Sequence, residues 1–237
     1  MFREGVGMRT SLPLLLALAV SAPSEAATRD FGVNGFDRVR VDGPYRVTLT
    51  TGVPPSAIAT GSDTALDAVS IDVQGRTLIV HVNRSSWGGY PGKDSGPAEI
   101  KIGTHDLSAA YLNGAGSLQI DRVKALAFEL SVQGSGVASI GSTDVDQLIV
   151  GVVGTASATL AGRAGKLTTT VRGVSSLDAS NLVVKDATIS ADGAATVKAN
   201  VTNAVKVDGT GPAMITLAGQ PACTSKLNGS ASVSGCR

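Results

Sequence analysis

The chain has 237 residues, with 29 glycines, 3% aromatic residues, 16% charged residues and a formal net charge of +1. This length can bury a core, and the many glycines and small side chains favour tightly turning strands over long helices. Because the basic residues are scattered and balanced by acidic ones, the composition does not favour nucleic-acid binding.

The N-terminus has the pattern of a secretory signal peptide over residues 1–26. Two arginines precede an apolar run over residues 12–22, and small residues occupy the cleavage positions of Ser24-Glu25-Ala26. We expect cleavage after Ala26, whether Met1 or Met8 is the start. The apolar run is about half as long as a membrane-spanning helix, so we expect no transmembrane segment in the mature chain. The predicted location is extracytoplasmic: periplasm, outer surface or medium.

Residues 27–106 have strand-like alternation without a regular repeat. Apolar residues alternate with polar ones in three short segments, at Val39, Val41, Val47 and Leu49, at Val69, Ile71 and Val73, and at Leu78, Val80 and Val82. The last two segments flank a Gln74-Gly75 turn signal. We interpret this region as β structure that caps the first coil of the repetitive region that follows.

A short glycine-centred motif recurs through residues 107–237. Its seven copies are Asn113-Gly114-Ala115-Gly116, Gln133-Gly134-Ser135-Gly136, Val153-Gly154-Thr155-Ala156, Arg172-Gly173-Val174-Ser175, Asp192-Gly193-Ala194-Ala195, Asp208-Gly209-Thr210-Gly211 and Asn228-Gly229-Ser230-Ala231. The aligned glycines are 20, 20, 19, 20, 16 and 20 residues apart. Near-constant periods in this range indicate a solenoid. The step of 16 predicts a shortened corner between Asp192 and Gly209.

The residues around each aligned glycine repeat the same alternation. The positions two before and four after it are apolar, the position two after it is small, and most positions between them are polar. Inward positions therefore share one parity, as a strand requires. The sequence predicts an all-β fold, a parallel β-helix-like solenoid with coils of about 20 residues, in which equivalent residues stack in columns.

Both cysteines lie near the end of the chain, at Cys223 and Cys236. Two close cysteines in an exported protein usually form a disulfide. We expect this disulfide to cap the last coil. The spacing does not match a metal or redox motif, and the sequence predicts no metal site and no cofactor.

The layout resembles the bacterial head GIN domain family, described as auto-transporter adhesins and as a domain of unknown function. The features that carry the resemblance are Phe36-Asp37-Arg38-Val39-Arg40-Val41-Asp42-Gly43, Gly75-Arg76-Thr77-Leu78-Ile79-Val80, and the motifs Gly114-Ala115-Gly116-Ser117 and Gly134-Ser135-Gly136-Val137. The resemblance covers residues 34–237 and implies a right-handed β-helix-like fold, an extracytoplasmic location and adhesion. It supplies no catalytic residues. The chain departs from the pattern where Val174-Ser175, Ala194-Ala195 and Ser230-Ala231 replace its second glycine.

One segment resembles a recognition surface, Ser85-Ser86-Trp87-Gly88-Gly89-Tyr90-Pro91-Gly92. Trp87 and Tyr90 are large aromatic residues set among glycines in an aromatic-poor chain, which suits contact with sugars or with partner pockets. The alternative is a hairpin connector whose Trp87 packs over an apolar coil end. We therefore name Trp87 and Tyr90 as the candidate ligand-binding residues and leave both interpretations open.

Catalysis on a β-helix would need carboxylates or basic residues gathered across neighbouring turns. The aligned motifs place Asp192 and Asp208 in one column, although both are ordinary turn residues. Asp144 and Asp146 share a polar face. His81 and His105 lie in the irregular region without an evident partner. Surface roles account for all six residues.

The sequence favours a non-enzymatic, exported β-solenoid that acts as an adhesin-like or envelope interaction module. Its expected partners are cell-surface or extracellular polysaccharides or proteins. Two alternatives stay open on the same scaffold, a carbohydrate-active enzyme and a purely structural envelope protein.

Overall fold

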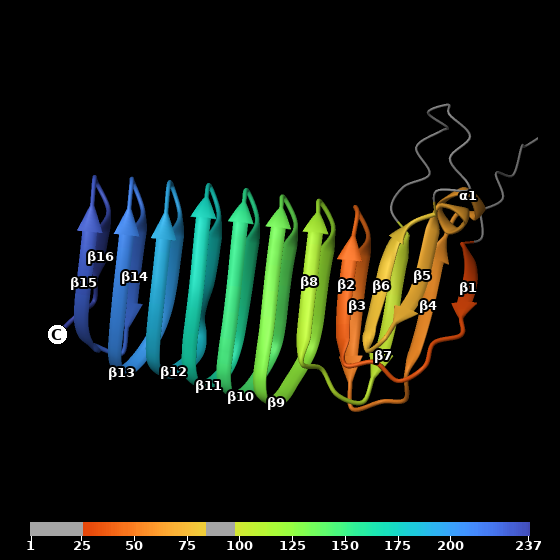
Figure 1. The fold of residues 1–237 in the computed structure, drawn as a ribbon, viewed down its shortest axis with the longest axis horizontal. Helices are drawn as coiled ribbons and strands as arrows, with labels where there is room; N and C mark the ends of the chain where they lie inside the picture. The colour runs from red at the N-terminus through yellow and green to blue at the C-terminus, as the bar shows by residue number, and fades with distance from the viewer. Residues whose placement is uncertain (1–25, 84–97) are drawn as a thin grey trace, which may run out of the picture.

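The structure is a computed structural model that describes residues 26–83 and 98–237. The predicted all-β solenoid is confirmed: the molecule has about six turns with coils about 20 residues apart (Figure 1). The elements before the long coils are β1 (Ala27–Phe31), β2 (Arg38–Asp42), β3 (Arg46–Thr51), β4 (Ser56–Gly61), α1 (Asp63–Asp67), β5 (Val69–Gln74), β6 (Thr77–Val82), β7 (Glu99–Thr104) and β8 (Ala109–Gly114). The remaining strands are β9 (Ser117–Gly134), β10 (Val137–Gly154), β11 (Ser157–Gly173), β12 (Ser176–Asp192), β13 (Thr196–Thr210), β14 (Met214–Ala218), β15 (Ala222–Asn228) and β16 (Ser232–Ser234).

Each strand from β9 to β13 wraps around most of one coil and belongs to two layers. The parallel register is continuous between neighbours: for example, Val137 pairs with Ser117 and Gly154 with Gly134. We call the layer that contains β5, β6, β2, β8, the C-terminal halves of β9 to β13 and β15 the first sheet. The second sheet contains β1, β4, β7, β3, the N-terminal halves of the same long strands, β14 and β16.

The core fills the space between the two sheets with stacked apolar side chains. One inward column runs through Phe128, Leu148, Leu167, Ala187 and Val205, all of them buried. The small residues two positions after the first five corner glycines are buried, and the inward pattern fails only in the last coil, where Leu227 is 38% exposed. The predicted inward parity is therefore confirmed.

The predicted corner at Gly209 is wrong by two residues. Gly209 pairs with Ala191 inside the strand and is buried, whereas Gly211 has the positive φ of +77° that the other corner glycines share. Successive corner glycines are therefore 18 residues apart here, from Gly193 to Gly211 and from Gly211 to Gly229. The shortening also lies elsewhere: the register between β12 and β13 shifts between Ala179 and Val183 and again between Val184 and Asp186, at the bend opposite the glycine corner.

An additional rung comes from the N-terminal region. Strand β2 lies between β6 and β8, and β3 lies between β7 and β9. The corner that joins them stacks on the first repeat corner, where the Gly43 N–H donates to the Asn113 carbonyl oxygen at 2.9 Å. The chain then leaves the stack, forms β4, α1, β5, β6 and β7 at the outer end, and returns on the other side of β2 as β8. The division of the chain into a capping region over residues 27–106 and a repeat region over residues 107–237 stays a prediction.

The two ends of the solenoid differ. At the N-terminal end the outermost strands, β1 with β4 and β5 with β6, pair antiparallel, and α1 lies beside them (Figure 1). At the C-terminal end the last coil stacks directly on β13 and β14. Within the described residues, no helix is long and apolar enough to cross a membrane.

Candidate functional site

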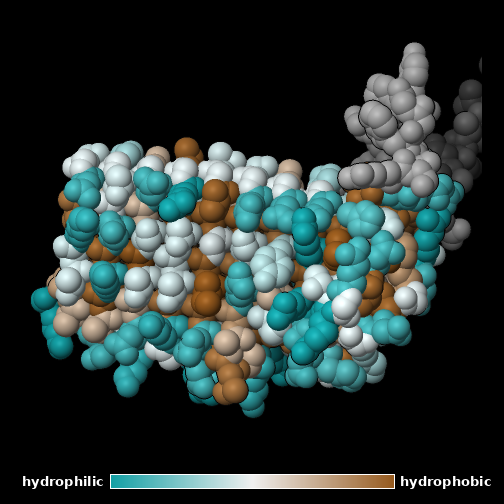
Figure 2. Space-filling view, viewed as in Figure 1, coloured by the Kyte–Doolittle hydropathy of each residue, from teal (hydrophilic) through white to brown (hydrophobic). Residues whose placement is uncertain are grey.

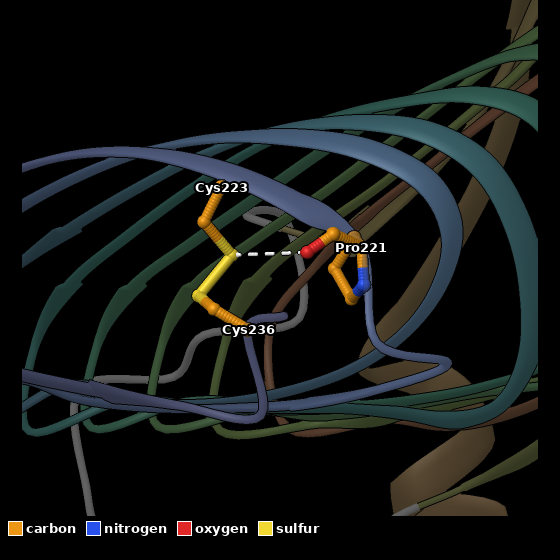
Figure 3. The surroundings of a disulfide bond; sticks show 3 residues. All are labelled: Pro221, Cys223 and Cys236. Carbon is orange, nitrogen blue, oxygen red and sulfur yellow. Dashed lines mark hydrogen bonds between the residues drawn. A yellow bond between two sulfur atoms is a disulfide. The ribbon is translucent and has the colours of Figure 1, made fainter.

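Two of the residues predicted from sequence form a covalent link, and the other two lie outside the described residues. Cys223 and Cys236 form a disulfide across the last coil (Figure 3), which confirms that prediction. Cys223 pairs with Val205 in register, so it continues the inward column that ends the core. Trp87 and Tyr90 belong to residues 84–97, which the structure does not describe, and their role stays a prediction.

The predicted acidic column does not exist. Asp208 pairs with Ser190, and Asp192 pairs with Thr210, so the two carboxylates belong to different columns. The error follows from the misplaced corner glycine. Asp144 forms a two-pronged ion pair with Arg163, at 2.7 and 2.9 Å, and this contact lowers the pKa of Asp144. Asp146 is exposed on the same bend.

The histidines occupy surface positions in the irregular region. His81 Nε2 lies 2.9 Å from Asp72 Oδ2, and the Ser70 hydroxyl donates to the same oxygen at 3.0 Å. The serine therefore contacts the carboxylate rather than the imidazole, an arrangement that does not activate its hydroxyl as a nucleophile. His105 is exposed after β7. Among the described residues, no group of three or more His, Cys, Asp or Glu side chains is placed to hold a metal ion.

The most developed surface feature is centred on Tyr111, in the middle of β8 on the outer face of the first sheet. Its register neighbours are Arg40 on β2 and Ser131 on β9, and the same outward column continues through Gly151, Thr170 and Ser190. Tyr111 is thus a large aromatic side chain next to four small ones, before the column ends with Asp208 and Lys226.

Two hollows meet at Tyr111. The larger, of about 660 Å³, is lined by Tyr111 and by mostly polar residues: Arg40, Asp42, Thr77, Asn113, Gly114, Gln133 and Gly134. The smaller, of about 260 Å³, is lined by Tyr111 together with Arg38, Ser108, Ala109, Ala127, Phe128, Glu129 and Ile149. We call these residues the Tyr111 surface. Both hollows are shallow and open, so they suit a ligand that lies along the sheet rather than one that is enclosed.

The side chains of the larger hollow hold one another in place. Asp42 accepts hydrogen bonds from Arg40 Nε at 3.0 Å and from the Asn113 amide at 2.7 Å. The Gln133 amide donates to the Ser131 hydroxyl at 3.3 Å. These contacts use only part of the hydrogen-bonding capacity of a carboxylate and a guanidinium, so the hollow offers both donors and acceptors to a ligand.

The ring of Tyr111 is also fixed at its far end. Its hydroxyl donates to Glu129 Oε2 at 3.1 Å. Partial burial and the Glu129 carboxylate raise the pKa of Tyr111, so the hydroxyl stays protonated and keeps this bond at neutral pH. The face of the molecule seen in Figure 2 mixes hydrophilic and hydrophobic side chains.

Sequence reasoning missed the Tyr111 surface. Tyr111 lies three residues before Gly114, and the same offset from the next four corner glycines gives Ser131, Gly151, Thr170 and Ser190, followed by Asp208 and Lys226. A single aromatic residue in an outward column that is otherwise small or charged was a readable signal. Its partners Arg40 and Asp42 were not readable, because they come from a rung that is 71 residues away in the chain.

Solved structures share the fold. A protein described as a putative adhesin from Bacteroides fragilis superposes with a TM-score of 0.78 at 19% identity, over 89% of this chain and 96% of that chain. A protein described as a putative lipid binding protein from Parabacteroides distasonis gives a TM-score of 0.69 at 16% identity, over 89% and 96%. A putative adhesin from Parabacteroides merdae gives 0.65 at 16% identity, over 89% and 95%. At these identities the likeness concerns the fold alone.

The curated proteins contain no match to this sequence. A family model does match, over residues 35–221, and its description is that of a putative auto-transporter adhesin with a head GIN domain. The match covers most of the chain and includes the β2–β3 rung, strands β4 to β7 and nearly all of the coils, which confirms the resemblance seen in the sequence. The chain belongs to the head GIN domain family of putative auto-transporter adhesins.

Proposed function

We propose that the mature chain is an exported, non-enzymatic interaction module of the cell envelope or cell surface, which binds its partner through the Tyr111 surface. The observation that carries this proposal is the placement of a fixed aromatic ring and a set of paired polar side chains on a flat, regular sheet. The adhesin description of the family supports a binding role, and the Cys223–Cys236 disulfide supports an oxidising, extracytoplasmic location.

Binding agrees better than catalysis with the state of the polar groups around Tyr111. Asp42 is already paired with Arg40 and Asn113, and Glu129 accepts the hydroxyl of Tyr111. Both carboxylates are therefore engaged in contacts within the Tyr111 surface, whereas a glycoside hydrolase needs two carboxyl groups that face the scissile bond. The arrangement presents a pre-ordered surface and leaves no carboxyl group without a structural partner.

The test is a binding assay with the mature protein, residues 27–237, on bacterial envelope fractions and on animal-cell monolayers. We expect saturable binding to at least one surface, with no release of new reducing ends from the polysaccharides present. Protein that has been unfolded in guanidinium, reduced and alkylated is the control for non-specific adsorption. Absence of saturable binding, or steady turnover of a polysaccharide, contradicts the proposal.

The loop predicted from sequence enters the same assay. If Trp87 and Tyr90 contribute to binding, Trp87→Ala reduces binding and leaves the melting temperature unchanged. If Trp87 instead packs over an apolar coil end, the same change lowers the melting temperature. Its fluorescence separates the two cases independently, because a buried indole emits at shorter wavelength and is protected from quenchers.

A further inference from the structure

We propose that the Tyr111 surface binds an internal segment of a neutral polysaccharide, with one sugar ring against Tyr111 and its hydroxyl groups on Arg40, Asp42 and Gln133. The proposal deepens the proposed function and rests on it, since it names the ligand class of the same surface. It is argued from the ring, the polar groups, the charge balance and the shape of the hollows.

The ring of Tyr111 is accessible from the side of the following coil. Its neighbour there is Ser131, and the next residue in the column is Gly151, neither of which is long enough to cover a ring in coils spaced about 4.8 Å apart. An aromatic face carries a partial negative charge and attracts polarised C–H groups, which the faces of a sugar ring supply. The hydroxyl bond to Glu129 holds the ring in place without using its face.

The polar groups beside the ring match vicinal hydroxyl groups. A carboxylate accepts two hydrogen bonds side by side, and a guanidinium donates two in the same geometry. Asp42 and Arg40 lie next to each other in the larger hollow, with Arg40 Nε 2.9 Å from Asp42 Oδ2. Gln133 adds an amide on the next strand, across Asn113 from Asp42. Because these side chains are already ordered, binding costs little of their conformational entropy.

The charges around Tyr111 select against an anionic ligand. Two arginines, Arg38 and Arg40, are balanced by Asp42 and Glu129 among the residues that line the hollows. A phosphate or uronate placed here would meet Asp42 or Glu129 as well as an arginine, so it would give up hydration without a net electrostatic attraction. The mostly polar lining of the larger hollow also does not suit an acyl chain.

The shape of the surface points to the middle of a polymer. The hollows lie on the open face of a continuous sheet, and the column beyond Tyr111 stays low as far as Ser190, about 19 Å away for four coils. A ligand therefore enters and leaves along the axis of the solenoid without meeting a wall. A chain end would require an enclosed pocket, and the described part of the molecule shows open hollows at this site.

The experiment uses the disulfide-bonded mature protein and hexasaccharides of β-1,4-linked glucose, mannose and N-acetylglucosamine and of α-1,4-linked glucose, with a hexameric uronate as the charged comparison. Binding is followed by calorimetry and by NMR shifts of the amides of Tyr111, Ser131 and Gln133. We expect at least one neutral hexasaccharide to bind and to shift these amides, and the uronate to bind more weakly. Tyr111→Ala should weaken binding at least about tenfold, as loss of an aromatic anchor does, and Tyr111→Phe should keep most of it.

A matched pair of variants tests the position independently of Tyr111. Ser131→Leu adds bulk directly beside the ring, and Ser190→Leu adds the same bulk in the same column four coils away. The first should weaken binding far more than the second, with equal melting temperatures. No neutral hexasaccharide binding, preferred binding of the uronate, or equal effects of the two leucine variants overturns the inference. If the protein still binds cell surfaces in those cases, the proposed function stands and only the ligand class is wrong.

Discussion

A Cβ atom on Gly134 would stand 2.7 Å from the carbonyl oxygen of Gly114 on the preceding coil. Gly134 also has a φ of +102°, in the region that side chains disfavour. The carbonyl of Gly134 in turn accepts the Thr155 N–H of the next coil at 2.8 Å. The corner thus stacks backbone directly on backbone, with no space for a side chain between coils.

Gly134→Val should therefore destabilise the fold by about 3 kcal/mol or more, because overpacking and backbone strain add. Ser135→Val is the control one residue further on, where the side chain is exposed and the backbone N–H keeps its bond to Gly114. We expect that control within about 0.5 kcal/mol of the parent. Denaturant unfolding measures both, and equal midpoints would show that the corners do not stack as described.

Removal of the Thr169 hydroxyl should increase the stability of the fold. The Oγ1 atom is buried without a hydrogen-bond partner, in a column between Val150 and Ile189. Removing an unpaired buried polar group of this kind relieves a desolvation cost of about 1 kcal/mol or more, so Thr169→Val should raise the melting temperature.

The matched control is Thr104→Val, at an equally buried threonine whose hydroxyl donates to the Phe36 carbonyl oxygen at 2.7 Å. Here the same substitution removes a made bond and leaves the carbonyl unsatisfied, so it should destabilise by about 1 to 2 kcal/mol. Calorimetric scans of the two variants should move in opposite directions. A decrease for Thr169→Val as large as that for Thr104→Val would mean that its hydroxyl has a partner.

Reduction of Cys223–Cys236 should lower the free energy of unfolding by about 2 to 4 kcal/mol, since the bond closes a loop with a sequence separation of 13 residues. Guanidinium titrations with and without reductant measure the difference, and the double variant Cys223→Ser, Cys236→Ser is the control for side effects of the reductant. Thiol labelling of the non-reduced, denatured protein should detect no free thiol. Two reactive thiols in that experiment would exclude the bond.

The carboxyl of Asp72 should titrate below its ordinary range. Hydrogen bonds from His81 and then from Ser70 lower its pKa. A lowered pKa in the folded state contributes stability that is fully present above the unfolded value, and this contribution is lost as the pH falls through the folded pKa, below about 4. Because the pair is exposed to solvent, the effect on stability is small.

Carbon-detected NMR titration follows this group directly. We expect its midpoint to rise in His81→Ala, with Asp178 as an internal reference, since the pKa of Asp178 is lowered instead by Ser180. An unchanged Asp72 midpoint in the variant would assign its shift to another contact.

The period of the glycine motif predicted the coils and the inward columns, because each of these repeats a local pattern, and the disulfide followed separately from two cysteines close together in the sequence. The corner near Gly209 could not be placed in the same way. Gly209 and Gly211 are two residues apart, so exchanging them leaves every side chain on the same face of the strand. Only the conformation of the turn distinguishes the two glycines. The available sequence signal was Pro212, which follows Gly211 as Pro44 follows Gly43.

The β2–β3 rung and the Tyr111 surface escaped prediction for a different reason. Gly43 stacks on the corner at Gly114, which is 71 residues later. A period near 20 residues does not relate these two corners. Alternation indicates that Tyr111 faces outward, but which residues surround it depends on the pairing of β8 with β2 and β9. That pairing is a long-range choice among several similar strands, which composition and spacing do not determine.

The disulfide at the last coil also determines where a pulling force enters the molecule. A load on the C-terminus passes from Cys236 directly to Cys223, so the residues between them carry no tension. The first segment to be stretched is then the connection between β14 and β15. Since the hydrogen bonds between coils run along the solenoid axis, tension along that axis opens them in succession, and the module should lengthen coil by coil instead of rupturing in one step.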